Sequence, residues 1–568
     1  MKADSAPPSR ADEGWRATEP KAALSTSRGE IPDARFQLPF VLLVFLTHAF
    51  VLMRAQGFRV IDDAYITFRY IDNLLNGHGL VFNIGERVEG YSNFLWLVLL
   101  IPFRAFGIDP VHAAQGLGMT CGLGVLIVTY HLALRLMGSP RLGFFAVLLL
   151  ALDGSFVRWA VDGLETQLFT LLLLTAFWLE MVPGSRLRPT GRSFLEGLSL
   201  GLASLTRPEG LLFIVGIVAY RVVGGTYWAL RQSPPGPVGR TPEQRLPLAG
   251  SSSFWLGLLA LLSGAALITG PHFLWRHAYY GEWLPNTAYV KVIPGFVSFV
   301  RGMRYAVLFG YQHLAIWAAL LVAHVLGRRA RAAHARHAAH PLRLPALASG
   351  AMVLYIIVIG GDWMNQGRFF VPIAPFLALL VVERAARALG EVIPGQGYRC
   401  TGVTWLLLAF AAVGGFYGSS WRTEWPRLEQ ARLEHEGRQA VIAWLKAHAP
   451  ADALLLTEEI GEIPFYTGLR TLDVYGLIDP WIARHGIYEP DAPAGHQKAD
   501  LNHSLSFKPE FMVMAGFKKT WQRHMRAKGK GVRYPELIHY DWVPVVFPEG
   551  RLEIYRRRDI SISDEDGG

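Results

Sequence analysis

The sequence predicts a polytopic α-helical membrane protein with a smaller α/β domain at its carboxyl end. Hydrophobic residues make up 51% of the 568 residues, and the mean hydropathy is +0.26. Long apolar runs alternate with short charged loops up to about residue 420, and the composition is mixed beyond it. The net charge of +10 comes largely from arginines in loops between apolar runs, where they set membrane topology. We therefore expect the lipid bilayer, and no nucleic acid, as a partner.

Composition divides the chain into three predicted regions. Residues 1–35 are polar and rich in Pro, Ser and Ala, unlike a typical signal peptide, and we expect a disordered cytoplasmic tail. Residues 36–420 hold the apolar runs and form the predicted transmembrane catalytic domain. Residues 421–568 are numerous enough to bury a core of their own. They predict an extracytoplasmic α/β domain.

The first elements place the chain relative to the membrane. Residues 36–55 form the first predicted span, because a helix needs roughly 20 apolar residues to cross the hydrocarbon core. Residues 64–76 have an apolar and a polar helical face, which indicates a helix lying on the membrane surface. Residues 93–107 are apolar but short and contain Arg104, so they form either a span or a second interfacial helix. The positive-inside rule favours the interfacial helix.

We expect about eleven transmembrane helices in total by the length rule. After residues 36–55, the predicted spans are residues 111–137, 142–160, 166–181, 193–206, 210–223, 254–273, 305–326, 344–359, 370–382 and 405–417. Residues 275–304 are predicted to be an outer loop. If residues 193–223 were one kinked helix, the later arginine-rich loops would lie outside, contrary to the charge bias.

The C-terminal region has the pattern of a small α/β domain. Residues 427–448 predict a helix. Short runs rich in β-branched and aromatic residues predict strands at 453–457, 511–514, 543–547 and 552–555.

This topology gathers the unusual polar residues on the outer face. Acids, bases and aromatic residues at one membrane face suit a substrate with an apolar tail, a phosphate and a sugar. Arg and Lys neutralise phosphate, and a carboxylate takes the proton of an attacking hydroxyl. The candidate catalytic residues are Asp62 and Asp63, and the candidate substrate-binding residues are Glu165, Arg207, Asn286, Lys291, Asp362, Trp363 and Arg368.

Several motifs occur in a characteristic order. After the first span and its adjacent acids come VEGYSN at 88–93, DGLET at 162–166, TRPEG at 206–210, GD at 361–362, GLIDP at 476–480 and GHQK at 495–498. In this combination the chain resembles the GT-C superfamily of membrane glycosyltransferases that use polyprenyl-phosphate sugars. Within it, the chain is most similar to the mycobacterial-type terminal arabinofuranosyltransferases and their bacterial relatives.

The resemblance implies a chemistry and a location. It implies transfer of D-arabinofuranose from a polyprenyl-phosphate donor to a cell-envelope glycan or glycoprotein acceptor. It places the reaction on the periplasmic or extracellular side of a bacterial inner membrane. We expect no cofactor and assign no metal site, and any requirement for a divalent metal stays open. Carried onto this chain, Asp62 or Asp63 is the catalytic carboxylate. Which of the two acts, and whether the transfer inverts or retains configuration, stays open.

Two other functions fit parts of the pattern. A GT-C transferase for a hexose or an aminopentose would need the same lipid-phosphate site. A transporter or flippase for a lipid-linked sugar would also need a polar cavity in the bilayer. Transporters usually show inverted repeats and polar residues near mid-span, whereas here the acids lie outside the spans and no internal duplication is evident.

Each candidate residue also has a structural interpretation. Asp62 or Asp63 is a possible helix cap, although one cap explains only one of them. Arg207 is as well suited to anchor a lipid headgroup as to bind substrate. Lys291 and Arg368 are as well suited to be snorkelling side chains at the membrane interface as to bind phosphate.

The remaining candidates have similar alternatives. Glu165 and Asp362 also suit ion pairs inside the bundle, and Trp363 suits an interfacial aromatic belt. Three distal residues either shape acceptor access or stabilise their own loops: Asp479, His496 and Lys498.

Overall fold

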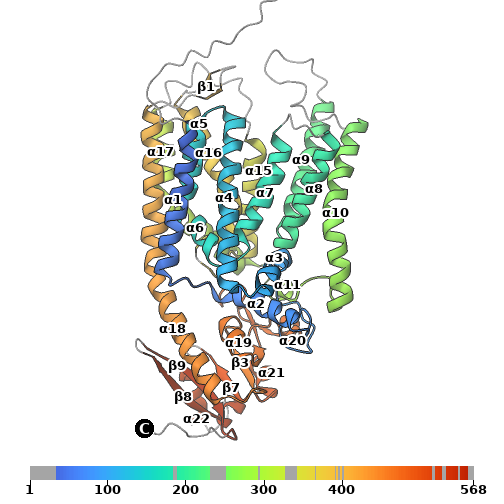
Figure 1. Cartoon of the computed structure of the whole chain (residues 1–568), viewed down its shortest axis with the longest axis vertical. Coiled ribbons are helices and arrows are strands. Elements are labelled where there is room, and N and C mark those ends of the chain that lie inside the picture. The colour runs from blue at the N-terminus through green and yellow to red at the C-terminus, as the bar shows by residue number, and fades with distance from the viewer. Residues whose placement is uncertain are drawn as a thin grey trace, which may run out of the picture.

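The structure is a computed structural model. It describes residues 34–182, 188–230, 251–291, 295–326, 342–364, 366–389, 392–393, 397–398, 402–490, 492–514, 518–526, 533–547 and 550–560. A bundle of long helices occupies one half of the molecule and a mixed α/β region the other, as Figure 1 shows. The predicted disordered tail, residues 1–35, lies almost entirely outside the described residues.

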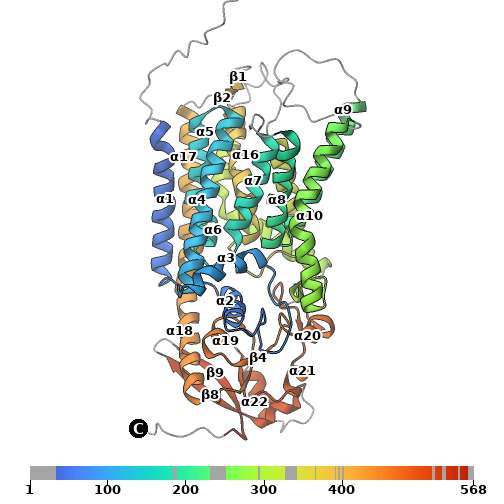
Figure 2. The same cartoon turned by 45° about the vertical axis from the view of Figure 1, so that its right-hand side comes forward.

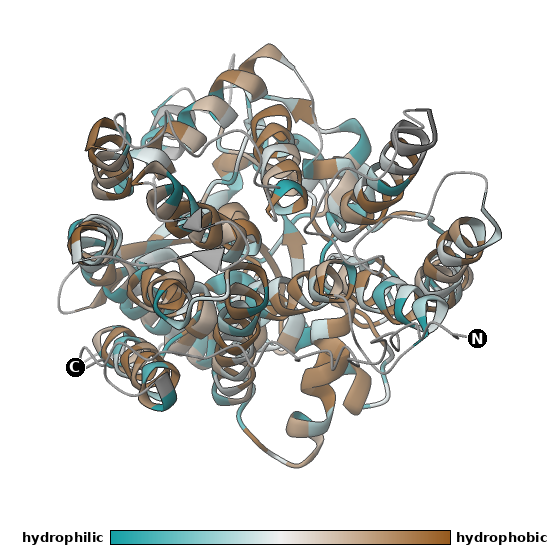
Figure 3. Ribbon diagram, turned by 90° about the horizontal axis from the view of Figure 1, so that it is seen from above, coloured by the Kyte–Doolittle hydropathy of each residue, from teal (hydrophilic) through white to brown (hydrophobic). Residues whose placement is uncertain are grey.

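The bundle is that of a multi-pass membrane protein, and hydrophobic residues predominate along its helices (Figure 3). Five described helices are long and apolar enough to span a membrane: Arg35–Ala55 in α1 (Ala34–Ala55), α4 (Pro110–Met137), α10 (Ser252–Tyr280), Arg368–Ala388 in η2 (Arg368–Ile373) with α16 (Ala374–Ala388), and Gly402–His448. The number rises to seven if each of two bent pairs is one span. Shorter apolar helices are α3 (Phe94–Ala105), α7 (Thr166–Met181), α9 (Gly210–Leu230) and α15 (Arg343–Ile359). The count of about eleven remains a prediction.

Two of the predicted spans are each broken by a bend. The span at residues 142–160 consists of α5 (Pro140–Leu152) and α6 (Gly154–Val161), bent by 62°. The span at residues 305–326 consists of α12 (Phe296–Gln312) and α13 (Leu314–Leu326), bent by 70°. The side chain of Asp153 caps α6 by accepting a hydrogen bond from the Phe156 N–H, and it also contacts the ring of His313. A polar contact thus joins the two bends.

The segment between α1 and α4, residues 56–109, lies between the bundle and the α/β region (Figures 1 and 2). Helix α2 (Asp62–Leu75), predicted to lie on the membrane surface, is buried from Ala64 to Ile71, and its polar side contacts the C-terminal region at Arg69. Arg69, expected to face water, is buried and donates hydrogen bonds to the carbonyls of Phe82, Pro464 and Leu469. Helix α3 has 12 residues, or about 18 Å, too short for a crossing.

The predicted outer loop at residues 275–304 is largely helical. Helix α10 continues to Tyr280, α11 covers Asn286–Lys291, and α12 begins at Phe296. The apolar length of residues 254–273 therefore underestimated how far the helix extends beyond the hydrocarbon core.

The C-terminal region contains a five-stranded mixed sheet in the order β4-β3-β7-β9-β8. Strand β3 (Leu454–Thr457) is parallel to β4 (Arg470–Asp473) and to β7 (Phe511–Val513). Strand β9 (Gly550–Arg557) is antiparallel to β7 and to β8 (Tyr540–Phe547). The four predicted strands overlap β3, β7, β8 and β9. The sequence analysis missed β4, whose four residues include an arginine and an aspartate and give no alternating signal.

Helices cover both faces of this sheet, because successive strand residues point to opposite faces. On one face, Leu455 packs in a cluster with Val441 and Leu445 of α18 (Trp425–His448). On the other, Leu456 packs in a cluster with Leu505 of α21 (Leu501–Ser506).

Helix α17 (Gly402–Gly415) continues into α18 through the π-helical segment η3 (Phe416–Glu424). The predicted boundary between residues 420 and 421 thus falls inside a continuous helix, and the division into domains remains a prediction. The other described elements are α8 (Pro189–Thr206), α19 (Glu462–Thr467), α20 (Pro480–His485), α22 (Lys518–Arg526), η4 (Pro535–His539), β1 (Val392–Ile393), β2 (Gly397–Tyr398), β5 (Ile487–Tyr488) and β6 (Lys498–Ala499).

Candidate active site

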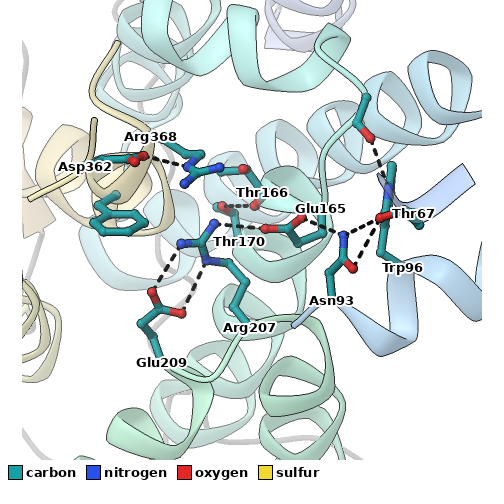
Figure 4. Close-up of polar contacts among 12 residues, drawn as sticks. Thr67, Asn93, Trp96, Glu165, Thr166, Thr170, Arg207, Glu209, Asp362 and Arg368 are labelled. Atoms are coloured by element: carbon teal, nitrogen blue, oxygen red, sulfur yellow. Dashed lines mark hydrogen bonds and ion pairs between the residues drawn. The ribbon is translucent and has the colours of Figure 1, made fainter. Parts of the chain in front are cut away.

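A buried ion network lies where α7, α8 and α9 meet. Glu165 precedes α7, and Arg207 separates α8 from α9. The Nη1 of Arg207 donates to Glu165 Oε1 at 2.9 Å, and its Nη2 donates to Glu209 Oε1 at 3.2 Å (Figure 4). The amide of Asn93 donates to the other oxygen of Glu165 at 3.2 Å. Because two carboxylates flank the buried guanidinium, its charge is already compensated within the protein. The geometry therefore favours the ion-pair interpretation for Glu165 and Arg207.

A second buried pair follows α15. The Nε of Arg368 donates to Asp362 Oδ2 at 2.7 Å (Figure 4). Its guanidinium lies 5.5 Å from the ring centroid of Trp159. The turn that follows α15 needs a glycine at position 361, because its φ of +72° is in the left-handed region. A Cβ at this position would also lie only 2.7 Å from the Cβ of Tyr305. Arg368 is thus also committed to a carboxylate.

Asp62 is a helix cap, but for a helix 400 residues away. Its Oδ1 accepts a hydrogen bond from the Glu462 N–H at 2.7 Å, and its Oδ2 accepts one from the Gly461 N–H at 3.0 Å, at the start of α19. Burial and the nearby charge of Glu459 raise the pKa of Asp62, against the opposing charge of Arg438. A Cβ on residue 461 would lie only 2.0 Å from the Asp62 carbonyl oxygen. Asp62 therefore joins the start of α2 to the C-terminal region.

Asp63 is the less committed of the two acids. Its side chain is half-buried, and in the part of the chain that the structure describes it has neither a hydrogen bond nor an ion pair. Its charge acts on the ring of His496, which lies on the loop between β5 and β6. The pair of acids thus separates into a structural cap and a carboxylate that is available to a substrate.

Helix α11 holds two candidate residues with different roles. The side-chain amide of Asn286 donates to the carbonyl oxygens of Gly476 and Leu477 at 2.8 and 3.0 Å, which fixes that loop against α11. Lys291, at the other end, is exposed, and its ammonium group has no hydrogen bond or ion pair to any described residue. A Cβ on Gly495 would lie 3.6 Å from Lys291 Cγ, so the lysine side chain runs alongside the loop that carries His496.

The free groups converge around His496. Trp363 is 40% exposed, and its ring packs edge-on against the imidazole at a centroid distance of 5.4 Å. The charges of Asp63, Lys291 and Asp362 all act on this ring. We call Asp63, Lys291, Trp363 and His496 the open cluster. It contains a carboxylate, an ammonium group, an aromatic surface and an imidazole, the groups needed for proton transfer, phosphate binding and sugar contact.

The other two distal candidates have structural contacts. Asp479 Oδ1 accepts hydrogen bonds from the Trp481 and Ile482 N–H groups and caps α20. The ammonium group of Lys498 donates to two carbonyl oxygens, those of Tyr289 and Ala483, at 2.8 and 2.7 Å. His496 was predicted only as a residue that shapes acceptor access or stabilises its own loop, because only its motif marked it and no local signal links it to Asp63, 433 residues earlier in the sequence.

No group of three or more His, Cys, Asp or Glu side chains suited to a metal ion occurs among the described residues. The expectation that the protein needs no cofactor remains a prediction.

Parts of the chain are similar in sequence to known proteins. A family model described as a domain of unknown function (DUF8728) matches residues 426–556. Terminal beta-(1->2)-arabinofuranosyltransferase from Mycobacterium tuberculosis is 29% identical over 362 residues, which is 56% of this chain and 51% of that protein. The protein of the same name from Corynebacterium glutamicum is 27% identical over 391 residues, 64% of this chain and 53% of that protein. The alignments thus span about half the length of these curated relatives.

A solved structure shows the same arrangement of elements. The crystal structure of ArnT from Cupriavidus metallidurans, bound to undecaprenyl phosphate, superposes with a TM-score of 0.54 at 14% identity and covers 92% of this chain and 99% of that one. This chain has the GT-C fold. The resemblance to arabinofuranosyltransferases stated from the motifs is confirmed by the sequence relatives.

Proposed function

We propose that this GT-C protein is a membrane glycosyltransferase that moves D-arabinofuranose from a polyprenyl phosphate to a cell-envelope glycan or glycoprotein. The observation that carries the proposal is the open cluster, where the uncommitted carboxylate of Asp63 and the uncommitted ammonium group of Lys291 both act on the same imidazole. The names of the two sequence relatives support the sugar, and the lipid in the solved GT-C structure supports the donor class.

In this proposal Asp63 is the catalytic base. The hydroxyl oxygen of the acceptor attacks C1 of the donor sugar, and its proton moves to the Asp63 carboxylate. The bond between C1 and the phosphate oxygen breaks, and the electron pair leaves with the polyprenyl phosphate. Phosphate is already a good leaving group, so a general acid is less necessary than in glycoside hydrolysis.

Lys291 and Trp363 hold the donor. The lysine ammonium group, free of protein partners in the described chain, neutralises the phosphodiester as negative charge develops on the leaving group. The exposed ring of Trp363 offers a surface for the sugar, which is attached directly to that phosphate. Arg207 and Arg368, also predicted substrate-binding residues, are members of the buried ion pairs, and in this proposal they stabilise the structure around the site.

The second candidate is a GT-C transferase for a different sugar. The GT-C fold and a lipid-phosphate site are common to both, and the match to ArnT covers nearly the whole chain. A site that accepts a hexose or an aminopentose would use the same Asp63 and Lys291. The sugar therefore has to be decided by experiment.

Purified protein should be incubated with synthetic polyprenyl phosphates carrying arabinofuranose, a hexose or an aminopentose, with an arabinan acceptor, and the products analysed by mass spectrometry. We expect arabinose transfer, and none with an Asp63→Asn variant. Transfer of only another sugar would replace the donor assignment. Movement of an intact lipid-linked sugar across vesicles without any product would instead favour the transporter.

The side of the membrane follows from the same proposal. We expect the open cluster and the C-terminal region on the periplasmic or extracellular side of an inner membrane. A cysteine introduced at exposed Lys446 should react with an impermeant thiol reagent in intact cells, and one at Arg331, in a loop outside the described residues, should react only after lysis. The reverse labelling would overturn both the topology and the proposed outer reaction.

A further inference from the structure

His496 is held in a fixed position by aromatic rings. Its imidazole lies edge-on between Trp363 and Tyr475, with centroid distances of 5.4 and 4.6 Å and interplanar angles of 87° and 89°. The first ring belongs to the segment after α15 and the second to the C-terminal region. The imidazole therefore lies where the two halves of the molecule meet, within the open cluster.

The loop that carries His496 is tied to the bundle by Arg301 of α12. This guanidinium donates to the Ala492 carbonyl at 3.0 Å, to Gln497 Oε1 at 3.1 Å and to the Gly360 carbonyl at 3.2 Å. None of these acceptors is a carboxylate, so the side chain joins the loop to the end of α15 through neutral groups. Such bracing sets the position of the imidazole before any substrate binds.

The hydrogen bond at one ring nitrogen determines what the other can do. His496 Nδ1 lies 3.2 Å from the Ala494 carbonyl oxygen, which only accepts, so Nδ1 carries the hydrogen. In the neutral ring, Nε2 then has a free lone pair. Burial lowers the pKa of the His496 imidazole, against the opposing charges of Asp63 and Asp362. Nε2 has no hydrogen bond to any described residue.

We propose that His496 Nε2 accepts a hydrogen bond from a hydroxyl of the donor sugar and so positions that sugar for transfer. This inference rests on the proposed function. Lys291, the phosphate partner, lies alongside Gly495, and the donor sugar is the group attached directly to that phosphate. The sugar bound between Lys291 and Trp363 therefore presents its hydroxyls to the imidazole. An acceptor at this point selects sugars by the position of one hydroxyl.

The test compares two variants that separate the acceptor from the shape of the ring. His496→Leu removes the acceptor, and His496→Gln places an amide oxygen close to the position of Nε2. With polyprenyl-phosphate arabinofuranose at about pH 7.5, we expect the leucine variant to raise the donor KM and Kd about tenfold with little change in kcat. The glutamine variant should stay near the wild type. The matched control is His485→Gln, because the wild-type His485 ring also bonds a backbone carbonyl, that of Trp481, and this change should leave donor affinity unaltered.

The pH dependence of the donor Kd tests an effect that a purely structural role of His496 would not produce. Because burial lowers the pKa of the His496 imidazole, Nε2 of the wild type gains a proton only once the pH falls below that lowered pKa, at a more acidic pH than for a free imidazole. Below that point Nε2 can no longer accept, so the donor Kd of the wild type should rise toward that of the leucine variant. The glutamine variant should lack this rise. Asp63, Lys291, Asp362 and Tyr475 also face the ring, and because they are unchanged in both variants, the comparison removes their contribution.

The outcomes separate this inference from the proposed function. Equal donor affinity in the leucine variant and the wild type overturns the role of His496, as does a pH response that persists in the glutamine variant. If the leucine variant fails to fold, the glutamine variant's pH response still decides the question. A wild-type protein that binds no polyprenyl-phosphate sugar overturns both proposals.

Discussion

Substituting the two adjacent acids one at a time should produce two different defects. Asp62 accepts hydrogen bonds from two backbone N–H groups at the start of α19, whereas Asp63 has no such partner among the described residues. Asp62→Asn should therefore reduce stability, and Asp63→Asn should stop transfer while leaving the fold intact. From the sequence alone, both changes are expected to abolish transfer.

The magnitudes follow from the contacts. Asparagine has one acceptor oxygen and an NH₂ group that would face a backbone donor, so Asp62→Asn loses one charge-assisted hydrogen bond, about 1.5–3 kcal/mol. For a region of roughly 150 residues, where each kcal/mol shifts Tm by about 2–4 °C, this lowers Tm by about 3–12 °C. Loss of a general base costs about 10²–10⁴ in rate, so Asp63→Asn should raise the barrier by about 3–5 kcal/mol.

The assay measures both quantities on the same preparations. Thermal melting of the detergent-purified protein reports stability, binding of polyprenyl-phosphate arabinofuranose reports donor affinity, and mass spectrometry reports turnover. Asp63→Asn should melt and bind donor like the wild type. Wild-type turnover in Asp63→Asn, with turnover lost in a stably folded Asp62→Asn, would refute the assignment and make Asp62 the base.

Three further substitutions test the neighbouring contacts. Lys291→Gln should leave stability unchanged and weaken donor affinity about tenfold or more, unlike Lys446→Gln; unchanged affinity would make Lys291 an interfacial side chain. Arg207→Met should cost about 3–5 kcal/mol in chemical denaturation, because it leaves two buried glutamates unpaired, and an unaltered midpoint would contradict a structural role. Gly461→Ala should destabilise by about 1–3 kcal/mol, because its Cβ would lie 2.0 Å from a backbone oxygen, whereas Gly116→Ala, with nothing within 4 Å, should be neutral.

Apolar length and charge placement were enough to predict the membrane class and much of the C-terminal region. The predicted helix at 427–448 and all four predicted strands have counterparts in α18, β3, β7, β8 and β9. These signals are local, because hydrophobic periodicity depends on neighbours in the sequence. The bends at Asp153 and His313 were missed, because hydropathy averages over polar contacts between helices such as the one that joins these two residues.

The candidate site shows the same division. The sequence by itself predicted candidate residues for the chemistry: the adjacent acids, Lys291 and the motifs that resemble those of GT-C proteins. Only the tertiary structure shows that the two acids have different contacts. A helix start in the C-terminal region occupies Asp62, whereas the charge of Asp63 acts on the imidazole of His496. Contacts across some 400 residues depend on how whole elements pack, and no pattern in neighbouring residues records them.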